Sequence, residues 1–255
     1  MQKMLNRVPE VTIYFWMIKI MATTVGETAA DFLALTLNLG LGVTSYIMGG
    51  LLLIVLLNQF RLKRYVPASY WLVVVLVSIV GTLITDRLVD EFGVTLVTTN
   101  IVFSVALLVV FVLWYLSEKT LAMHSINTTK REMYYWAAIL LTFALGTSTG
   151  DYLAEASGLG YAQSALVFGA LIAIITFGYY YFQMNAVLAF WLAYILTRPF
   201  GASIGDLLSQ PTKNGGFGWG TTGTSMLFLC IITSLVIYLS LKRKKSALQP
   251  IDRQN

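Results

Sequence analysis

Four aspartates recur in one short motif, and these residues are suited to binding a cation. Each aspartate has a glycine five residues before it, a leucine two residues after it, and Ala, Thr or Gly immediately before it. The aspartates are Asp31, Asp86, Asp151 and Asp206, and the glycines are Gly26, Gly81, Gly146 and Gly201. Carboxylate oxygens are hard ligands for cations, and an ionisable residue inside an apolar span indicates a functional site. The motif therefore predicts a cation site made of four equivalent carboxylates.

Further oxygen-bearing side chains accompany the aspartates. In three copies a second acid lies four residues away, which places it on the same helix face: Glu27, Asp90 and Glu155. The fourth copy has Gln210 at this spacing. Hydroxyl groups within the motifs add neutral oxygens, and they belong to Thr28, Thr82, Thr147, Ser148 and Ser203. We expect these side chains to share a cation-binding or transport site with the aspartates.

Three basic residues lie near the motifs. Lys19 falls within its apolar span, Arg87 directly follows the second motif aspartate, and Arg198-Pro199 precedes the fourth motif. Snorkelling to the interface or a surface ion pair accounts for Lys19 and Arg87 as well as a function does. Arg198 lies two turns before the fourth aspartate, so Lys19 and Arg198 are candidates for a charge-compensated gate, and an anion pathway stays open. Because the acids outnumber these bases, we favour a cation.

Composition places the chain in a bilayer. Of its 255 residues, 57% are hydrophobic and 11% are charged, whereas a soluble domain is about a quarter charged. The net charge of +5 is distributed over short segments between apolar spans, which is typical of topology determinants and not of a nucleic-acid partner. One cysteine and one histidine exclude an intrachain disulfide and a His-rich metal site. We find no Ser-His-Asp, Cys-His or HExxH pattern, and expect neither a cofactor nor an enzyme.

Eight apolar segments are long enough to cross a membrane. They are residues 11–37, 41–60, 68–89, 94–116, 133–156, 160–182, 186–209 and 221–241. Lys and Arg gather before the first segment, after the second and fourth, and after the last, so the positive-inside rule predicts that both termini are cytoplasmic. Aromatic clusters open the odd segments and close the even ones, and we interpret them as a belt at the cytoplasmic interface.

The spacing of the motifs reveals an internal duplication. The first and second aspartates are 55 residues apart, as are the third and fourth, and the two pairs are offset by 120 residues. The fold class predicted is an all-α integral membrane protein of about eight transmembrane helices from four parallel two-helix repeats in a single domain, 1–255. The repeats are 11–63, 66–119, 131–184 and 186–242, followed by a cytoplasmic basic tail, 243–255. We expect a pseudo-fourfold ring, or two pseudo-twofold halves, with the motif helices inside.

The repeat resembles a bacterial family of multi-pass membrane proteins of unassigned function, built from two-helix units with a Gly-Thr-x-x-x-Asp motif. The resemblance covers nearly the whole chain. Glu27 and Ala202 depart from it where the other copies have threonine, and Leu83 departs where the others have a hydroxyl. It implies the fold and topology and supplies no substrate.

Each aspartate lies about 25–30 Å along its helix from the cytoplasmic end, which places the four in the outer third of the membrane. A carboxylate at a helix C-terminus meets the negative end of the macrodipole. We therefore consider a break or kink at the motif glycine, which would put the aspartate near the start of a second segment. Interfacial carboxylates that only close the helix ends remain the simpler alternative.

These observations favour a transporter or channel for a cation in the bacterial inner (cytoplasmic) membrane. A metal ion exchanged against protons is the most specific form of this hypothesis, and no particular metal is indicated. The expected partners are the lipid bilayer and the cation, and homo-oligomer formation is left open. The main alternative is a non-transporting scaffold or accessory subunit whose polar motifs lock helices together, and the third is an enzyme acting on lipid or a redox carrier.

Overall fold

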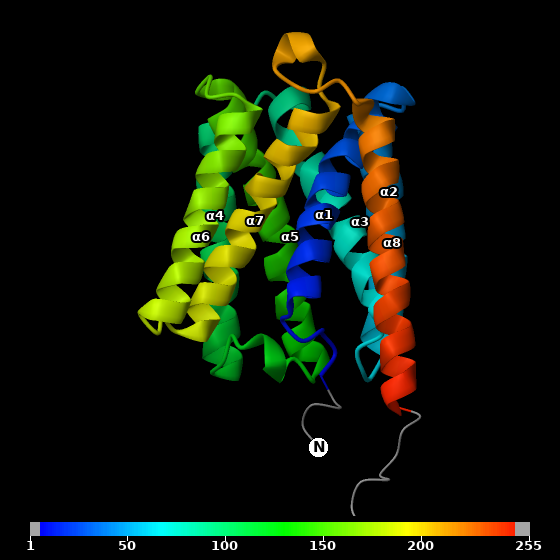
Figure 1. The fold of residues 1–255 in the computed structure, drawn as a ribbon, viewed down its shortest axis with the longest axis vertical. Coiled ribbons are helices and arrows are strands. Elements are labelled where there is room, and N and C mark those ends of the chain that lie inside the picture. The colour runs from blue at the N-terminus through cyan, green and yellow to red at the C-terminus, as the bar shows by residue number, and fades with distance from the viewer. Residues whose placement is uncertain (1–5, 248–255) are drawn as a thin grey trace, which may run out of the picture.

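The computed structural model describes residues 6–247, and the described residues contain helices and no strand. Eight α-helices follow one another along the chain (Figure 1): α1 Ile13–Asp31, α2 Leu41–Arg61, α3 Pro67–Asp86, α4 Leu96–Glu118, α5 Thr129–Asp151, α6 Tyr161–Tyr181, α7 Ala186–Ser209 and α8 Gly220–Ala247. Each overlaps one of the eight predicted segments, so the all-α prediction is confirmed. The predicted basic tail starts in the last turn of α8, and residues 248–255 lie outside the described part.

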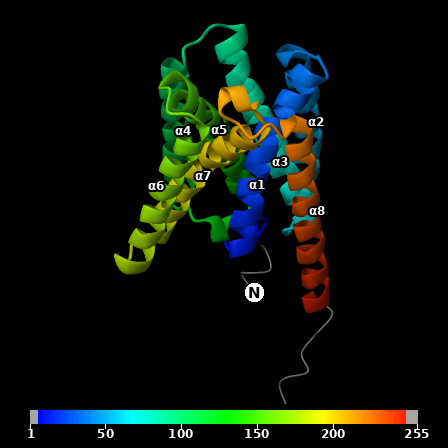
Figure 2. The same ribbon diagram turned by 45° about the horizontal axis from the view of Figure 1, so that its top comes forward.

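The helices form two concentric layers. The odd helices α1, α3, α5 and α7 pack against one another in a closed cycle, with α7 returning to α1. Each even helix packs on the odd helix that follows it in this cycle, namely α2 on α3, α4 on α5, α6 on α7 and α8 on α1. The layers can be followed in Figures 1 and 2. In the membrane-length part of α3, 61% of the residues are buried, against 17% in α2, α4 and α8. The pseudo-fourfold ring is thus the arrangement adopted.

Several helices have the length and composition of membrane spans. Within the described residues these are α2, α3 with its extension to Glu91, α4, α6, α7 and α8 up to Lys244. The two remaining helices, α1 and α5, belong to the inner layer, where neighbouring helices shield polar residues from lipid. The outer helices present large apolar side chains outward, such as Leu53, Leu108 and Leu166. These features suggest a multi-pass membrane protein.

The motif glycines bring the inner helices into close contact. Each glycine faces the residue that lies three positions before the glycine of a neighbouring repeat, and the pairs are Gly26–Ser78, Gly81–Phe143, Gly146–Arg198 and Gly201–Thr23. A Cβ added to any of these glycines would lie 2.5–2.7 Å from the Cβ of its partner. Small residues allow helix backbones to approach in membranes. The four contacts form one closed cycle, so the glycines position the four motifs around a common axis.

The inner helices run through these glycines without a break. Gly26 lies inside α1 and Gly81 inside α3, while α5 and α7 likewise continue past Gly146 and Gly201. The helix break considered at the glycine is therefore not present. The close contact with a neighbouring helix explains the residue type instead.

Gly81→Ala tests the glycine contacts. The new Cβ would meet the Cβ of Phe143 at 2.6 Å and the backbone of Ala144 at 3.1 Å, so we expect a loss of about 1–3 kcal/mol of stability from overpacking. The matched control is Gly50→Ala on α2, where a Cβ has no neighbour within 4 Å. Thermal unfolding in detergent measures both, and an unfolding temperature for Gly81→Ala equal to that of the control would contradict the close contact.

A layer of aromatic side chains closes the end of the ring where the chain starts and ends. Each inner helix carries aromatic residues ten and eleven positions before its motif glycine. They pair from one repeat to the next, with ring centroids 5.7 Å apart for Phe15–Trp71, 5.4 Å for Tyr70–Trp136, 6.3 Å for Tyr135–Trp191 and 5.8 Å for Trp16–Phe190. Most of these rings are buried. The interpretation of the odd-helix clusters as an interfacial belt is therefore wrong, because they pack inward as a cycle.

Candidate functional site

Arg198 of α7 occupies the centre of the inner ring. Its Nη2 donates to Oε2 of Glu27 at 3.0 Å, to Oγ1 of Thr147 at 2.6 Å, and to the hydroxyl of Thr82. These three residues directly follow the motif glycines of α1, α5 and α3, and the fourth equivalent position holds Ala202. One nitrogen is therefore enclosed by side-chain oxygens from the three other repeats. We call these three acceptors the oxygen cage.

Local sequence explains why the arginine reaches the axis. Arg198 is three residues before Gly201, which is the position that faces the glycine of the preceding repeat, and Gly146 leaves room for its side chain. Its remaining donors reach backbone carbonyls, with Nη1 bonded to Thr23 at 3.0 Å and Nε to Phe143 at 3.3 Å. Arg198 is fully buried and Glu27 is 6% exposed. Such a pair is stable only when its hydrogen-bonding groups are satisfied, as they are for this guanidinium.

The charge compensation predicted for Arg198 is present, but with a different acid. The sequence placed Arg198 near the aspartate two turns further along the same helix. The structure instead pairs it with Glu27 of α1, 171 residues away. Glu27 also approaches the hydroxyl of Thr82 at 3.4 Å. The buried ion pair therefore joins the first repeat to the fourth across the seam where the ring closes.

Carboxylates gather beside this pair. One oxygen from each of Glu27, Asp151 and Asp206 lies within 4.8 Å of the others. The structure thus brings two of the four motif aspartates, Asp151 and Asp206, close to each other. The set Glu27, Asp151 and Asp206 is referred to below as the carboxylate trio.

The motif aspartates stand out by their lack of a bonding partner within the described part of the chain. Among residues 6–247, none of the four makes a side-chain hydrogen bond or an ion pair. Asp206 is only 8% exposed, and the other three are half-buried. An ionised carboxylate removed from water is costly unless it is paired. The arrangement leaves carboxylate oxygens free to bind a cation or a proton.

The aspartates lie at one end of the helix ring, so the two ends of the polar axis differ. Asp31, Asp86 and Asp151 are the last residues of α1, α3 and α5, at the end of the ring opposite the aromatic layer and the two termini (Figure 1). From the aromatic layer toward that end, the axis passes Lys19, then Arg198 with its oxygen cage, then the aspartates. The aspartates therefore lie at one end, and two buried basic side chains, Lys19 and Arg198, separate them from the other end.

Lys19 is buried in the inner ring and does not snorkel. It is 1% exposed, and its Nζ donates to the carbonyl of Tyr194 at 2.8 Å and to the hydroxyl of Thr197. The amine also lies 4.3 Å from the centroid of the Tyr194 ring. No carboxylate of the described chain forms an ion pair with it. The snorkelling alternative is wrong for Lys19, while Arg87 does form the surface pair, 2.7 Å from Glu91.

Some predicted site residues make no hydrogen bond to Arg198 or the motif aspartates within the described chain. Thr28 bonds to Ser225 of α8 at 2.7 Å, and Ser148 donates to the Leu96 carbonyl of α4 at 3.3 Å, so both hydroxyls are directed at outer helices. Ser203 is buried and its hydroxyl has no partner in the described chain. Glu155 is exposed and accepts from the hydroxyl of Tyr161 at 2.9 Å. Of the predicted hydroxyls, only Thr82 and Thr147 contact the axial groups.

A π-helical turn follows the aspartate in three repeats. These turns are η2 Phe32–Thr36, η3 Arg87–Glu91 and η5 Tyr152–Ala156. Each is closed by the same type of bond, in which Phe32, Arg87 or Tyr152 accepts from the N–H five residues later at 2.9–3.0 Å. In the fourth repeat, the carbonyl of Asp206 accepts from Gln210 with ordinary α-helical spacing. Single π-turns often mark functional positions, and here they directly follow three of the four carboxylates.

Of the four residues that lie three positions before a motif glycine, sequence reasoning identified Arg198 and missed Thr23, Ser78 and Phe143. Thr23 and Phe143 supply carbonyls to Arg198, and Ser78 fits against Gly26. It also missed Asn100 of α4, which bonds the Ser148 carbonyl and the Thr149 hydroxyl. Extending the ungapped alignment of the four motifs toward their N-terminal ends would have indicated the first group, because these positions are equivalent in all four repeats.

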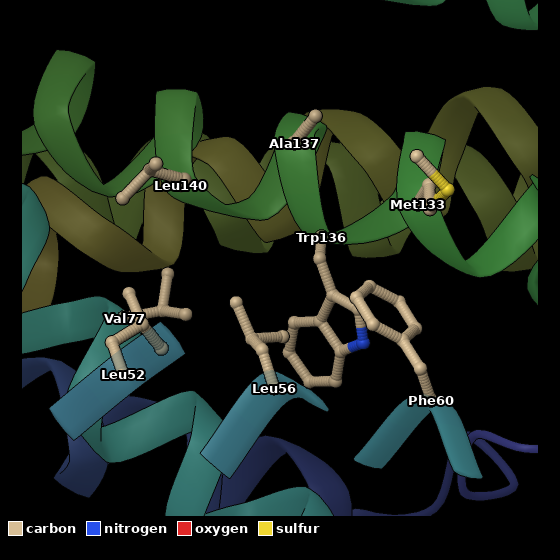
Figure 3. A pocket seen from close by; sticks show the side chains of 8 residues that line it. All are labelled: Leu52, Leu56, Phe60, Val77, Met133, Trp136, Ala137 and Leu140. Carbon is tan, nitrogen blue, oxygen red and sulfur yellow. The ribbon is translucent and has the colours of Figure 1, made fainter. Parts of the chain in front are cut away.

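An apolar groove on the flank is separate from the polar axis. It lies between α2 and α5 above α3 (Figure 3), and its lining comprises Leu52, Leu56, Phe60, Val77, Met133, Trp136, Ala137 and Leu140. No charged side chain lines it. The groove offers nothing to an ion, so the candidate site is confined to the oxygen cage and the four aspartates.

Comparison with known proteins agrees with the fourfold architecture. The family model described as Repeat of Unknown Function (DUF347) matches residues 14–65, 69–120, 134–185 and 189–245. Each matched stretch holds one inner helix and the outer helix that follows it. Neither the curated proteins nor the solved structures yielded a match. With four copies covering most of its length, the chain belongs to the DUF347 repeat family, a family of unknown function.

Proposed function

We propose that this protein is a membrane transporter or channel for a cation, a metal ion in exchange for protons in its most specific form. The observation that carries the proposal is that the four motif aspartates have no partner within the described chain, and that one of them, Asp206, is more than nine-tenths buried. A purely structural polar group would be expected to have a hydrogen-bonding partner. A passing cation or proton supplies the missing partner.

The proposed orientation follows from the distribution of basic residues. We infer that both termini face the cytoplasm of a bacterial cell, so the aspartates face the outer side of the cytoplasmic membrane. A cation entering from outside would meet the aspartates first and then Arg198 with its oxygen cage. The aromatic layer closes the cytoplasmic end in this conformation. The proposal includes no catalytic step and no nucleic-acid partner, and it is compatible with a monomer or a homo-oligomer.

A specific observation supports the alternative of a structural scaffold. Every nitrogen of the Arg198 guanidinium is bonded to another inner helix, and the motif glycines contribute only close packing. Both features would lock a helix ring that transports nothing. The scaffold does not account for the unpartnered aspartates, and for this reason we place transport first.

Flux measurements in liposomes test the proposal. We expect the reconstituted protein to carry one class of cation with saturable uptake, and a pH gradient to change the rate if protons are exchanged. Radiolabelled Na⁺, K⁺, Mg²⁺, Ca²⁺ and Mn²⁺ would be compared in protein-containing and protein-free vesicles, with and without the gradient. Uptake equal to that of protein-free vesicles for every ion under both conditions would contradict transport of these cations and favour the scaffold.

A further inference from the structure

The Nη2 atom of Arg198 is surrounded by oxygens of the kind that bind cations. It contacts three side-chain oxygens from three helices, those of Glu27, Thr82 and Thr147. A carboxylate and two hydroxyls are ligands that hard cations accept. The fourth equivalent residue is Ala202, which leaves the cage without an oxygen from α7. Arg198 itself belongs to α7, so the repeat that contributes no oxygen to the cage contributes the guanidinium that the cage binds.

The carboxylate trio lies next to the cage and shares one of its members. Glu27 bonds Arg198 through Oε2 and also belongs to the group with Asp151 and Asp206. Asp206 is more than nine-tenths buried and has no partner within residues 6–247. Glu27 therefore lies between Arg198, whose nitrogens are all hydrogen-bonded, and the carboxylates of Asp151 and Asp206, which have no hydrogen-bonding partner in the described chain.

We propose that the carboxylate trio and the cage hydroxyls form a site for a hard divalent cation, and that Arg198 is a tethered competitor that holds Glu27 when the ion is absent. The inference rests on the proposed function and specifies its substrate class and its central residue. The three carboxylates and one guanidinium carry a formal charge of −2, which one divalent ion neutralises. Oxygen-only ligands match Mg²⁺, Ca²⁺ and Mn²⁺.

The asymmetry of the ring supports this exchange. Directly after the motif glycine, only the first repeat carries an acid, Glu27. Three residues before the motif glycine, only the fourth repeat carries an arginine, Arg198. The two meet where α7 returns to α1. An arriving ion takes the carboxylate of Glu27, while the guanidinium keeps its bonds to the Thr23 and Phe143 carbonyls. Ion binding would thus break the Arg198–Glu27 ion pair, which joins α7 to α1 where the helix ring closes.

Binding of Mn²⁺ to the purified protein in detergent tests the inference, and electron paramagnetic resonance measures the free ion. Because removing the competitor frees Glu27, we expect Arg198→Gln to bind Mn²⁺ about tenfold more tightly than wild type. Glu27→Gln should bind it about tenfold more weakly. Arg198→Lys keeps the charge and should stay near wild type. Arg87→Gln is the matched control, because Arg87 pairs with Glu91 away from the axis.

Unchanged or weaker Mn²⁺ binding by folded Arg198→Gln would overturn the competitor role. If wild type nevertheless transports a cation, the proposed function stands and only this inference falls. If wild type neither binds nor carries any cation, both fall. Should Arg198→Gln not fold, the side-chain Nε–H signal of Arg198 in the wild-type NMR spectrum decides. This signal is identified by its loss in Arg198→Lys, and a saturable shift on adding Mg²⁺ is expected, whereas no shift overturns the proposal.

Discussion

The double variant Asp151→Asn/Asp206→Asn is expected to lose cation flux by about 100-fold or more while it stays folded. It removes two of the three carboxylates that lie within 4.8 Å of one another, and each charged contact with an ion accounts for about tenfold or more in affinity. The unfolding temperature should be unchanged or raised, because these side chains make no hydrogen bond within the described chain and their carboxylates lie close together. Flux is measured in liposomes and stability in detergent.

Glu91→Gln is the matched control for this experiment. Glu91 is an exposed acid at the same end of the ring that pairs with Arg87 at 2.7 Å, and its replacement should leave flux near wild type. A double variant that transports normally would remove the aspartates from the pathway. A double variant that loses flux only because it unfolds would indicate the scaffold, in which the same carboxylates serve packing.

The variant Glu27→Gln is expected to lose about 3–5 kcal/mol of stability, because it leaves the fully buried Arg198 without its carboxylate. The remaining acceptors are neutral hydroxyls and carbonyls, which stabilise a buried charge less than an anion does. The double variant Glu27→Gln/Arg198→Gln should recover much of the loss, since neither side chain is then charged. Thermal or denaturant unfolding in detergent measures all three proteins.

The control for this series is Glu155→Gln. Glu155 is exposed and bonded to Tyr161 at the mouth of the ring, so a change within about 0.5 kcal/mol is expected. Equal stability of wild type and Glu27→Gln would show that the ion pair does not hold the ring together. Failure of the double variant to recover would show that the two residues act separately and not as a pair.

The helices and the repeats could be predicted because each depends on a pattern within a short stretch of sequence. Eight helices follow from apolar segments of membrane length, and the four repeats follow from a constant spacing of Gly and Asp. The approach of Asp151 to Asp206 was also predictable, since parallel repeats that close into a ring place equivalent residues at one level. The aromatic positions were visible as well, but their interpretation as an interfacial belt was wrong. A hydropathy pattern does not distinguish aromatic side chains that pack against one another inside the protein from aromatic side chains that face the membrane interface.

What the sequence determined by itself was the helix number, the parallel repeat and the identity of the acids, because hydrophobic length and periodicity act within each segment. Only the tertiary structure decided that Arg198 pairs with Glu27, 171 residues away, and that Thr28 and Ser148 face outer helices. These outcomes depend on how each helix is rotated in the ring. The rotation is set by the contact between each motif glycine and the residue three positions before the glycine of a neighbouring repeat. The two helices meet so closely there that no residue larger than glycine fits at the motif position.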